Sequence, residues 1–187
     1  MSKVTLAKSS LSKDLLDLVT QYALFDELKN FNPDHVQSDG MHCKYADPLM
    51  ESILLKIKPE IESIVNKKLG PTYSYYRVYR DGSILEKHID RNECEISATL
   101  NFGQNLESNW PIWMGNEKIE IEPGFFAIYD GCEIEHWRDR LSCQRGGYLV
   151  QGFFHYIDLD GPNKNLIFDG RRGIGYPPLG KKYIIYT

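Results

Sequence analysis

The sequence is poor in the residues that cross-link small proteins. Its four cysteines are Cys43, Cys94, Cys132 and Cys143. They form no CxxC pair and none of the close spacings typical of a zinc knuckle or a secreted disulfide framework. We therefore expect reduced thiols and a cytoplasmic protein.

Long apolar runs and an excess of positive charge are also missing. No segment approaches the roughly 20 apolar residues that a membrane span requires, and the N-terminal MSKVTLAKSSLSKDLL has no apolar stretch followed by a cleavage site. The formal net charge is −4, with a pI near 5.7. Nucleic acid and membranes are therefore not expected partners. We expect a soluble, unprocessed protein, whose oligomeric state the sequence does not indicate.

Two segments before residue 71 carry apolar residues at helical spacing. Ser12 can cap the first segment, whose apolar face comprises Leu15, Leu16, Val19, Tyr22 and Ala23. Asp47 and Pro48 begin the second as cap and first helical residue. Gly70-Pro71 is predicted to end that helix, and Pro59 to kink or divide it.

From Tyr73 onward the pattern changes to short β-like runs separated by turn residues such as Asp81-Gly82 and Pro123-Gly124. Eight strands are predicted, at 72–80, 84–89, 95–102, 111–114, 118–122, 125–129, 134–138 and 147–157. Eight short antiparallel strands after two helices predict a mainly β, α+β fold with a double-stranded β-helix (jelly-roll) core. We expect one domain over 1–187, with helical support in 1–71, the jelly-roll core in 72–158 and an irregular tail in 159–187.

Three residues of the β region predict a metal site. His88 and Asp90 are two apart, so on a strand both side chains project to the same face. His136, on a later strand, supplies a third ligand. Two histidines and one carboxylate on one face of an octahedral ion leave three positions open, an arrangement typical of non-heme Fe(II) oxygenases. His35, His42 and His155 lack partners at ligand spacing and are predicted to be core or surface residues.

At this point the sequence resembles the prolyl-4-hydroxylase-like branch of the 2-oxoglutarate oxygenases, over roughly Tyr73 to Ile157. Tyr79, Asp81-Gly82 and the His88-x-Asp90 motif follow the family's order. Glu122-Pro123-Gly124, FFAIY, His136 and the closing strand YLVQGFFHYID match as well. The phrases GCEIEHWRD and GPNKNLIFDGRRGIG look like a subgroup found in microbes and their viruses.

The resemblance implies an enzyme that uses Fe(II), 2-oxoglutarate and O2, with ascorbate as a candidate reductant. It implies that His88, Asp90 and His136 are the iron ligands and catalytic centre, and that Tyr79 contacts the cosubstrate. Thr99, which faces inward together with Ser97 by alternation, is a further candidate for the same pocket.

Two arginines compete for the distal carboxylate of 2-oxoglutarate. The family usually places a basic residue about ten positions past the distal histidine, and Arg145 fits by count. Counting back from His155, however, puts Gly147 at the expected position and leaves Arg145 in a turn. Arg138 shares the inward face with His136 and could bind a carboxylate through two parallel hydrogen bonds. The sequence leaves both open.

The resemblance implies that the substrate is a prolyl residue in a peptide or protein, hydroxylated while 2-oxoglutarate is converted to succinate and CO2. The alternatives are an oxygenase acting on a small molecule or nucleobase, and a non-enzymatic metal-binding jelly-roll module. A cupin with a structural ion would usually supply further histidine ligands, which this sequence does not place nearby.

Overall fold

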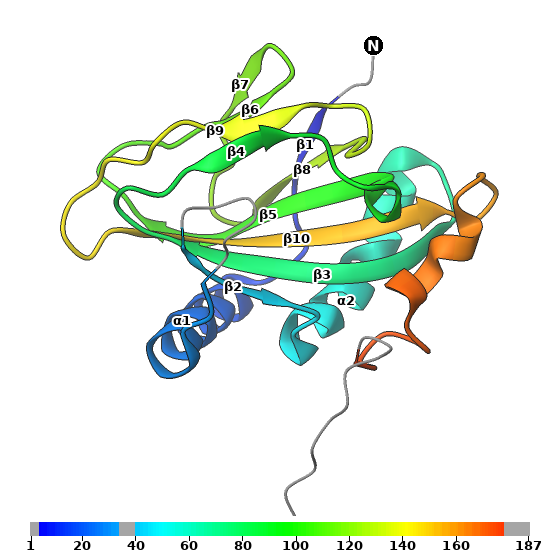
Figure 1. Ribbon diagram of the computed structural model, residues 1–187, viewed down its shortest axis with the longest axis horizontal. Coiled ribbons are helices and arrows are strands. Elements are labelled where there is room, and N and C mark those ends of the chain that lie inside the picture. The colour runs from blue at the N-terminus through cyan, green and yellow to red at the C-terminus, as the bar shows by residue number, and fades with distance from the viewer. Residues whose placement is uncertain (1–3, 34–39, 178–187) are drawn as a thin grey trace, which may run out of the picture.

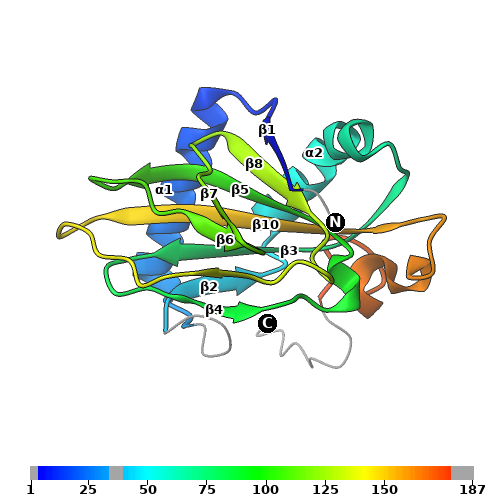
Figure 2. The ribbon, with the colours of Figure 1, turned by 90° about the horizontal axis from the view of Figure 1, so that it is seen from above.

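The computed structural model describes residues 4–33 and 40–177. Its layers are two facing β-sheets and, on the outer side of the larger sheet, two helices (Figure 1). Seen from above, the smaller sheet lies in front of the larger one, and the helices lie behind (Figure 2). His35 lies outside the described residues, as does the tail from residue 178.

Side-chain caps determine where both helices begin. Ser12 accepts a hydrogen bond from the backbone N–H of Leu15 at the start of α1 (Lys13–Asn30). Asp47 accepts from the N–H groups of Leu49 and Met50 at the start of α2 (Pro48–Val65). Each cap satisfies N–H groups that have no partner inside the helix, as the sequence predicted.

The end of α2 differs from the prediction. Asn66, in the left-handed conformation at φ 53°, ends the helix and donates its N–H to the carbonyl of Glu62. Asn tolerates this conformation because its short polar side chain can hydrogen-bond locally. Gly70-Pro71 instead lies in strand β3, beside a register irregularity where a missing N–H is tolerated. Of the two outcomes expected at Pro59, a kink or a division, the division does not occur, because the helix runs on through Pro59.

The predicted jelly roll is confirmed as two antiparallel sheets. The larger has the order β1-β8-β5-β10-β3-β2 and the smaller β4-β9-β6-β7. The strand bounds are β1 (Thr5–Lys8), β2 (His42–Tyr45), β3 (Leu69–Tyr79), β4 (Leu85–His88), β5 (Ile96–Asn105), β6 (Ile112–Met114), β7 (Glu117–Ile119), β8 (Phe125–Tyr129), β9 (His136–Arg138) and β10 (Tyr148–Asp158).

Two of these strands, β1 and β2, were not predicted. Each has four residues, which is too short for alternation to be distinguished from chance. They form the two edges of the larger sheet, β1 beside β8 and β2 beside β3. The region before residue 71 therefore extends the sheet as well as supplying helices. After β10, the tail contains a short 3₁₀ segment, η2 (Lys164–Gly170), and another, η1 (Asn92–Cys94), precedes β5.

Separate apolar cores fill the two spaces between the layers. The core between the helices and the larger sheet includes Val19, Ala23, Met50, Leu54, Ile57, Ile61, Tyr76, Leu100, Phe126 and Phe154. The core between the sheets includes Leu85, Ile112, Met114, Ile121, Ala127, Tyr129 and Ile134. The larger sheet therefore buries side chains on both of its faces.

None of the helices in the described part of the chain combines the length and the apolar character needed to cross a membrane.

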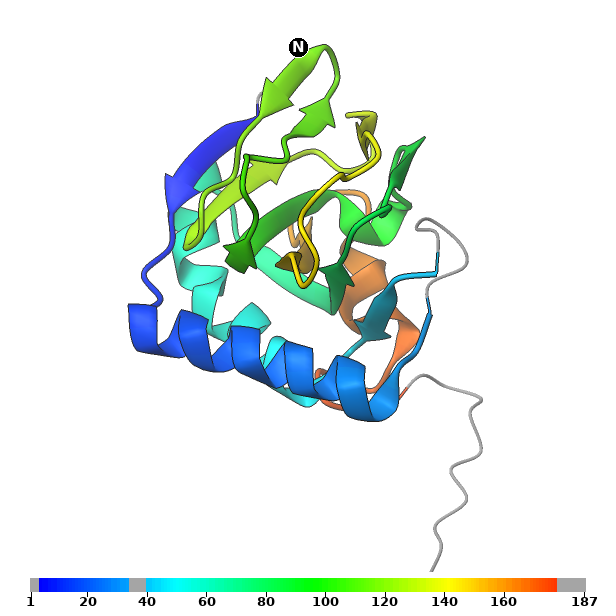
Figure 3. The same cartoon turned by 90° about the vertical axis from the view of Figure 1, so that its left-hand side faces the viewer.

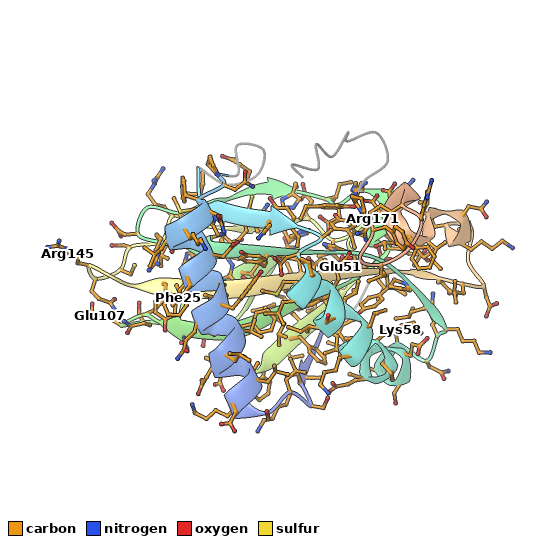
Figure 4. All side chains as sticks on the ribbon, turned by 90° about the horizontal axis from the view of Figure 1, so that it is seen from below. Phe25, Glu51, Lys58, Glu107, Arg145 and Arg171 are labelled. Carbon is orange, nitrogen blue, oxygen red and sulfur yellow. The ribbon has the colours of Figure 1, made fainter. Side chains whose placement is uncertain are left out.

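A buried ion pair fastens the C-terminal segment to α2. The Nη2 atom of Arg171 lies 2.6 Å from Oε1 of Glu51, and both side chains are almost fully buried. The same nitrogen donates to the carbonyl of Thr72 at 2.8 Å. Figure 4 labels both residues where the segment after η2 passes α2. This pair holds the tail against β3.

We predict that Arg171→Ala lowers the free energy of unfolding by about 3–5 kcal/mol, because it leaves the Glu51 carboxylate buried without a counter-ion. Arg172→Ala is the matched control, since Arg172 is exposed and should cost at most about 0.5 kcal/mol. Urea unfolding measures both. Equal midpoints for the two variants would contradict a stabilising role for the pair.

Candidate metal and cosubstrate site

The three predicted metal ligands lie together at one end of the smaller sheet. His88 on β4 and His136 on β9 are direct partners in the antiparallel pairing, with ring centroids 4.3 Å apart. Asp90 follows β4, and its Oδ1 atom lies 3.5 Å from Nε2 of His88 and 3.7 Å from Nε2 of His136. One ligand atom from each residue lies within 4.8 Å of the others. A single ion can therefore bind all three.

Both histidines are held in the form that binds metal through Nε2. The Nδ1 atom of His88 lies 2.6 Å from the carbonyl of Glu86, and that of His136 lies 2.9 Å from the carbonyl of Ile134. Because a carbonyl can only accept, each Nδ1 carries the proton and each Nε2 presents a lone pair. Such a second contact is typical of metal-binding histidines.

Asp90 is positioned by close backbone packing. Its N–H donates to the carbonyl of Gly131 at 2.8 Å, and its Oδ2 atom lies 3.3 Å from the hydroxyl of Ser97. A Cβ atom at Gly131 would lie 2.7 Å from that same Oδ2 and 2.5 Å from the carbonyl of Cys94. Only glycine therefore lets the chain approach the carboxylate this closely.

The electrostatics favour the metal-binding protonation states of Asp90 and His136. Burial alone would raise the pKa of Asp90, but the hydrogen bond that His88 donates when protonated, and the positive charge that His155, His136 and His88 carry in that form, lower it overall. Burial also lowers the pKa of His136, against the opposing effect of Asp90. A carboxylate and neutral imidazoles are the forms that bind metal.

A second group of possible ligands, Asp90 with Cys94 and His155, shares the carboxylate. It fits an ion less well. Burial raises the pKa of the Cys94 thiol far above its usual range, so the thiolate that a metal needs is disfavoured. The Cys94 sulfur also lies 3.1 Å from the hydroxyl of Tyr73, and Nδ1 of His155 lies 2.9 Å from the hydroxyl of Ser97.

A cavity of about 380 Å³ opens beside the triad. All three predicted ligands line it, and the other lining residues are Tyr45, Tyr73, Tyr75, Arg77, Leu85, Ile89, Arg91, Tyr129, Phe153 and His155. His155, predicted to be a core or surface residue, is buried and also lines this cavity.

Arg138 is a buried cation with no carboxylate partner among the described residues. It is 4% exposed, and burial lowers its pKa to about 10. The guanidinium donates to the carbonyl of Trp110 and, at 2.9 Å, to the side chain of Gln151, while its Nε atom has no hydrogen-bond partner. Its strand partner Leu85 lines the cavity. A buried, uncompensated guanidinium favours an anionic ligand.

The other predicted cosubstrate residues are placed in different ways. Thr99 accepts a hydrogen bond from Gln151, so Thr99, Gln151 and Arg138 form one chain of contacts. The ring of Tyr79 lies 6.0 Å from the Arg138 guanidinium. Arg145 is exposed in the turn before β10, where Figure 4 shows it at the outer end of the molecule. None of the four predicted cosubstrate residues, Tyr79, Thr99, Arg138 and Arg145, is among the residues that line the cavity.

Two residues of this region were not predicted. Arg77 lines the cavity, and its Nη1 atom lies 3.5 Å from the hydroxyl of Tyr79. Strand alternation could have predicted Arg77 as an inward-facing residue, because it lies two residues from both Tyr75 and Tyr79. Gln151 shares the inward face of β10 with Phe153 and His155, but a lone glutamine carries no motif.

The C-terminal segment contacts two residues that line the cavity, Arg91 and Tyr45, through Asp169. Its carboxylate binds Arg91 through two hydrogen bonds of 2.8 Å and accepts another from the hydroxyl of Tyr45. Phe168 and Asp169 both adopt the left-handed conformation, which is costly for residues other than glycine. These contacts offset the cost and hold the tail beside Arg91 and Tyr45.

Comparison with known proteins first shows what does not match. No protein-family model matches the chain. No curated protein matches it either.

Solved structures do match. A Pseudomonas putida prolyl-4-hydroxylase superposes with a TM-score of 0.63 at 15% identity, covering 83% of this chain and 93% of that one. The viral collagen prolyl hydroxylase of Paramecium bursaria Chlorella virus-1, in complex with 2-oxoglutarate, gives 0.60 at 12% identity, covering 82% and 95%.

A third match has a different activity. The α-ketoglutarate-dependent carbocyclase SnoK of nogalamycin biosynthesis gives a TM-score of 0.63 at 10% identity, covering 85% of this chain and 81% of that one. At these identities the likeness shows the fold, which is that of the 2-oxoglutarate- and Fe(II)-dependent oxygenases. Because hydroxylases and a carbocyclase share it, the fold does not identify a substrate.

We predict that Gly131→Ala weakens metal binding by 10- to 100-fold, roughly the effect of losing an outer contact to a ligand. The added methyl must displace the Asp90 carboxylate or the chain beside it. Gly173→Ala is the control, because its Cβ would meet nothing closer than 3.5 Å. Competition titration with Co(II) measures the metal affinity of both variants. Unchanged affinity in Gly131→Ala would contradict a role for Gly131 in positioning the Asp90 carboxylate.

We also predict that the metal-free protein loses stability as the pH falls from 6.5 toward 4. Burial lowers the pKa of His155 to about 4, below the value of about 6.5 for an unfolded chain. The unfolded state therefore binds the proton first, and stability falls by at most about 1.4 kcal/mol per pH unit for this group. His155→Phe should flatten that slope in urea unfolding, and an unchanged slope would show that His155 does not contribute.

Proposed function

We propose that this chain is an Fe(II)- and 2-oxoglutarate-dependent dioxygenase. The observation that carries the proposal is the convergence of two Nε2 lone pairs and one carboxylate on one side of a cavity. Two imidazoles and one carboxylate with open positions form the ligand set of non-heme Fe(II) oxygenases. A closed structural zinc site would need a fourth protein ligand.

His88, Asp90 and His136 would hold the ion. When bound, iron supplies the oxidising chemistry that couples decarboxylation of 2-oxoglutarate to oxidation of a substrate, with ascorbate as a candidate reductant. The chain's own residues do the binding and positioning. The carbonyls of Glu86 and Ile134 fix the imidazole rings, and Gly131 and Ser97 fix the carboxylate.

Arg138 is proposed to bind the distal carboxylate of 2-oxoglutarate. It follows His136 by two residues on β9, so both side chains leave the strand on the same face, roughly 7 Å apart. Thr99 and Gln151 orient the guanidinium from one side, and Tyr79 packs near it. One ligand of the ion, His136, and the proposed partner of the 2-oxoglutarate carboxylate, Arg138, thus lie on the same short strand.

We propose a prolyl residue in a peptide as the leading substrate. The support is the aromatic lining of the cavity, which includes Tyr73, Tyr75 and Phe153, since extended proline-rich segments dock into grooves lined by aromatic rings. The alternative is a small molecule. It is supported by the cavity volume of about 380 Å³, which lies within the range of small-molecule pockets.

We expect the iron-loaded protein to convert 2-oxoglutarate to succinate slowly without substrate, and His88→Ala, Asp90→Ala and His136→Ala to abolish both metal binding and turnover. Succinate is measured with Fe(II), ascorbate and O2 present. Adding a proline-rich peptide should accelerate succinate formation and add one oxygen atom to the peptide. Peptide without proline is the control.

Stoichiometric metal in all three variants would contradict the ligand assignment. Metal binding without succinate would favour the non-enzymatic module. Succinate without peptide oxidation would favour the small-molecule alternative.

We expect Arg138→Ala to raise the 2-oxoglutarate concentration required by 10- to 100-fold, because a charge-assisted contact of roughly 1.5–3 kcal/mol is lost. Arg145→Ala is the matched control and should be nearly silent. The measurement is 2-oxoglutarate affinity at full iron occupancy. An effect in Arg145→Ala but not in Arg138→Ala would reverse the assignment, and an effect confined to Arg77→Ala would move the role to that residue.

A further inference from the structure

His155 is a buried histidine beside the metal site to which the proposed function gives no role. It lies on β10, is 5% exposed and lines the same cavity as the three predicted ligands. Its direct partners on the neighbouring strands are Tyr73 on β3 and Ser97 on β5. Three adjacent strands of the larger sheet therefore bring these side chains together.

The side chains of Ser97 and His155 lie on the side of the larger sheet that faces the smaller one. Ala98 and Phe154, the next residues on β5 and one residue back on β10, pack in the core on the helix side. Figure 3 looks along the strands and shows α1 below the larger sheet, on that helix side. Ser97 and His155 thus point away from the helices and toward Asp90.

Ser97 connects His155 to the carboxylate of the metal site. Its Oγ atom lies 2.9 Å from Nδ1 of His155 and 3.3 Å from Oδ2 of Asp90. The carbonyl of Cys94 lies 3.1 Å from the same Oγ. An ionised carboxylate and a carbonyl can only accept, so both need the single hydroxyl proton, and the charged carboxylate is the stronger acceptor. The contact with His155 is then satisfied when its Nδ1–H donates to Oγ.

The two oxygens of Asp90 have different partners. Oδ1 lies 3.5 Å from Nε2 of His88 and 3.7 Å from Nε2 of His136, where one ion can bind all three atoms. Oδ2 instead accepts the hydrogen bond from Ser97. A carboxylate that turned to bind an ion through both oxygens would have to give up that hydrogen bond.

Packing holds the His155 ring and the contact between Ser97 and Asp90 in place. The rings of His155 and Tyr73 lie 4.6 Å apart, centroid to centroid. Among the described residues, the hydrogen bond with Ser97 is the only one that the His155 ring forms. A Cβ atom at Gly131 would lie 2.7 Å from both Ser97 Oγ and Asp90 Oδ2, so the backbone encloses this contact closely.

We propose that His155 is a positioning residue for the metal site, which acts through Ser97 to hold Asp90 so that only Oδ1 is offered to the ion. The inference rests on the proposed iron site and adds a residue to it. Partners of this kind orient the groups that bind a metal. Here the residue acts from β10, in the larger sheet, on a ligand that follows β4 in the smaller sheet.

The number of Asp90 oxygens that bind the ion decides how many coordination positions stay open. A carboxylate can bind a metal through one oxygen or through two. With two imidazoles and one oxygen, an octahedral ion keeps the three open positions typical of non-heme Fe(II) oxygenases. A second oxygen from Asp90 would occupy one of them. The hydrogen bond to Oδ2 therefore keeps a position available.

Cobalt binding to the full chain tests the role of His155. We expect His155→Phe, which keeps a ring but removes the N–H donor, to weaken Co(II) binding about 10-fold, the lower end of what the loss of an outer contact costs. The visible absorption spectrum of the cobalt-loaded variant should also change, because a second carboxylate oxygen alters the coordination. A residue needed only for stability would shift the unfolding midpoint and leave that spectrum unchanged.

The path through Ser97 is tested by a double variant. Ser97→Ala should change the Co(II) affinity and the spectrum in the same way as His155→Phe. Combining the two changes should add little, because both break one chain of contacts.

A matched pair of variants tests the Nδ1 contact. The amide N–H of His155→Asn can lie near the position of Nδ1, whereas the longer side chain of His155→Gln places it near that of Nε2. His155→Asn should therefore restore most of the Co(II) affinity and the wild-type spectrum, and His155→Gln should not.

A His155→Phe variant with the wild-type cobalt affinity and spectrum would overturn the role of His155. Additive losses in the double variant would overturn the path through Ser97, and equal behaviour of His155→Asn and His155→Gln would overturn the Nδ1 contact. An intense cobalt–thiolate absorption band would place the ion at Cys94 and overturn the proposal together with the iron site. Failure of the wild type to bind Co(II) would likewise count against the iron site itself, and not against His155 alone.

Discussion

The antiparallel register of β4 against β9 is the constraint on which the site depends. It places His88 directly opposite His136 and, three residues earlier on β4, Leu85 opposite Arg138. A slip of one residue would turn His136 to the outer face of the sheet and bring Trp137 into the cavity. Apolar packing supports this register, because Leu85, Met114 and Ile134 are buried in the core between the sheets.

Strand β9 carries two groups whose charge state matters for the site, His136 and Arg138. His136 is kept neutral by burial, and Arg138 is kept buried without a carboxylate partner. A buried cation is costly unless an anion accompanies it. The protein offsets part of this cost through Gln151 and the carbonyl of Trp110 and leaves the remainder for a ligand. The 2-oxoglutarate carboxylate that we propose as the ligand of Arg138 would supply the missing anion.

Much of the architecture could be predicted from the sequence because it follows from local rules. Ser12 and Asp47 identified the helix starts, and alternation identified the strands of the jelly roll. The spacing of His88 and Asp90 predicted that their side chains lie on one face, and the structure brings them together with His136. The end of α2 was misplaced because Gly70-Pro71 is a stronger sequence signal for a helix end than Asn66. The helix in fact ends at Asn66, which adopts the left-handed conformation. Local pattern ranks such signals but does not show which one the chain uses.

Other features could not be predicted because they depend on contacts between distant segments. Asp169 binds Arg91 across 78 residues, and Arg171 binds Glu51 across 120, so neither contact leaves a trace in local spacing. Arg138 and Arg145 stayed balanced for the same reason. Only the turn before β10 shows that Arg145 is exposed, and only the packing around β9 shows that Arg138 is buried.

The most direct test of this account is a crystal structure of the protein with Co(II) in place of iron and 2-oxoglutarate bound without oxygen. Anomalous scattering would locate the ion. The account predicts bonds from Nε2 of His88, Nε2 of His136 and one oxygen of Asp90, with the distal carboxylate of 2-oxoglutarate at Arg138. An ion bound by Asp90, Cys94 and His155 instead, or one enclosed by four protein ligands with no room for 2-oxoglutarate, would contradict it.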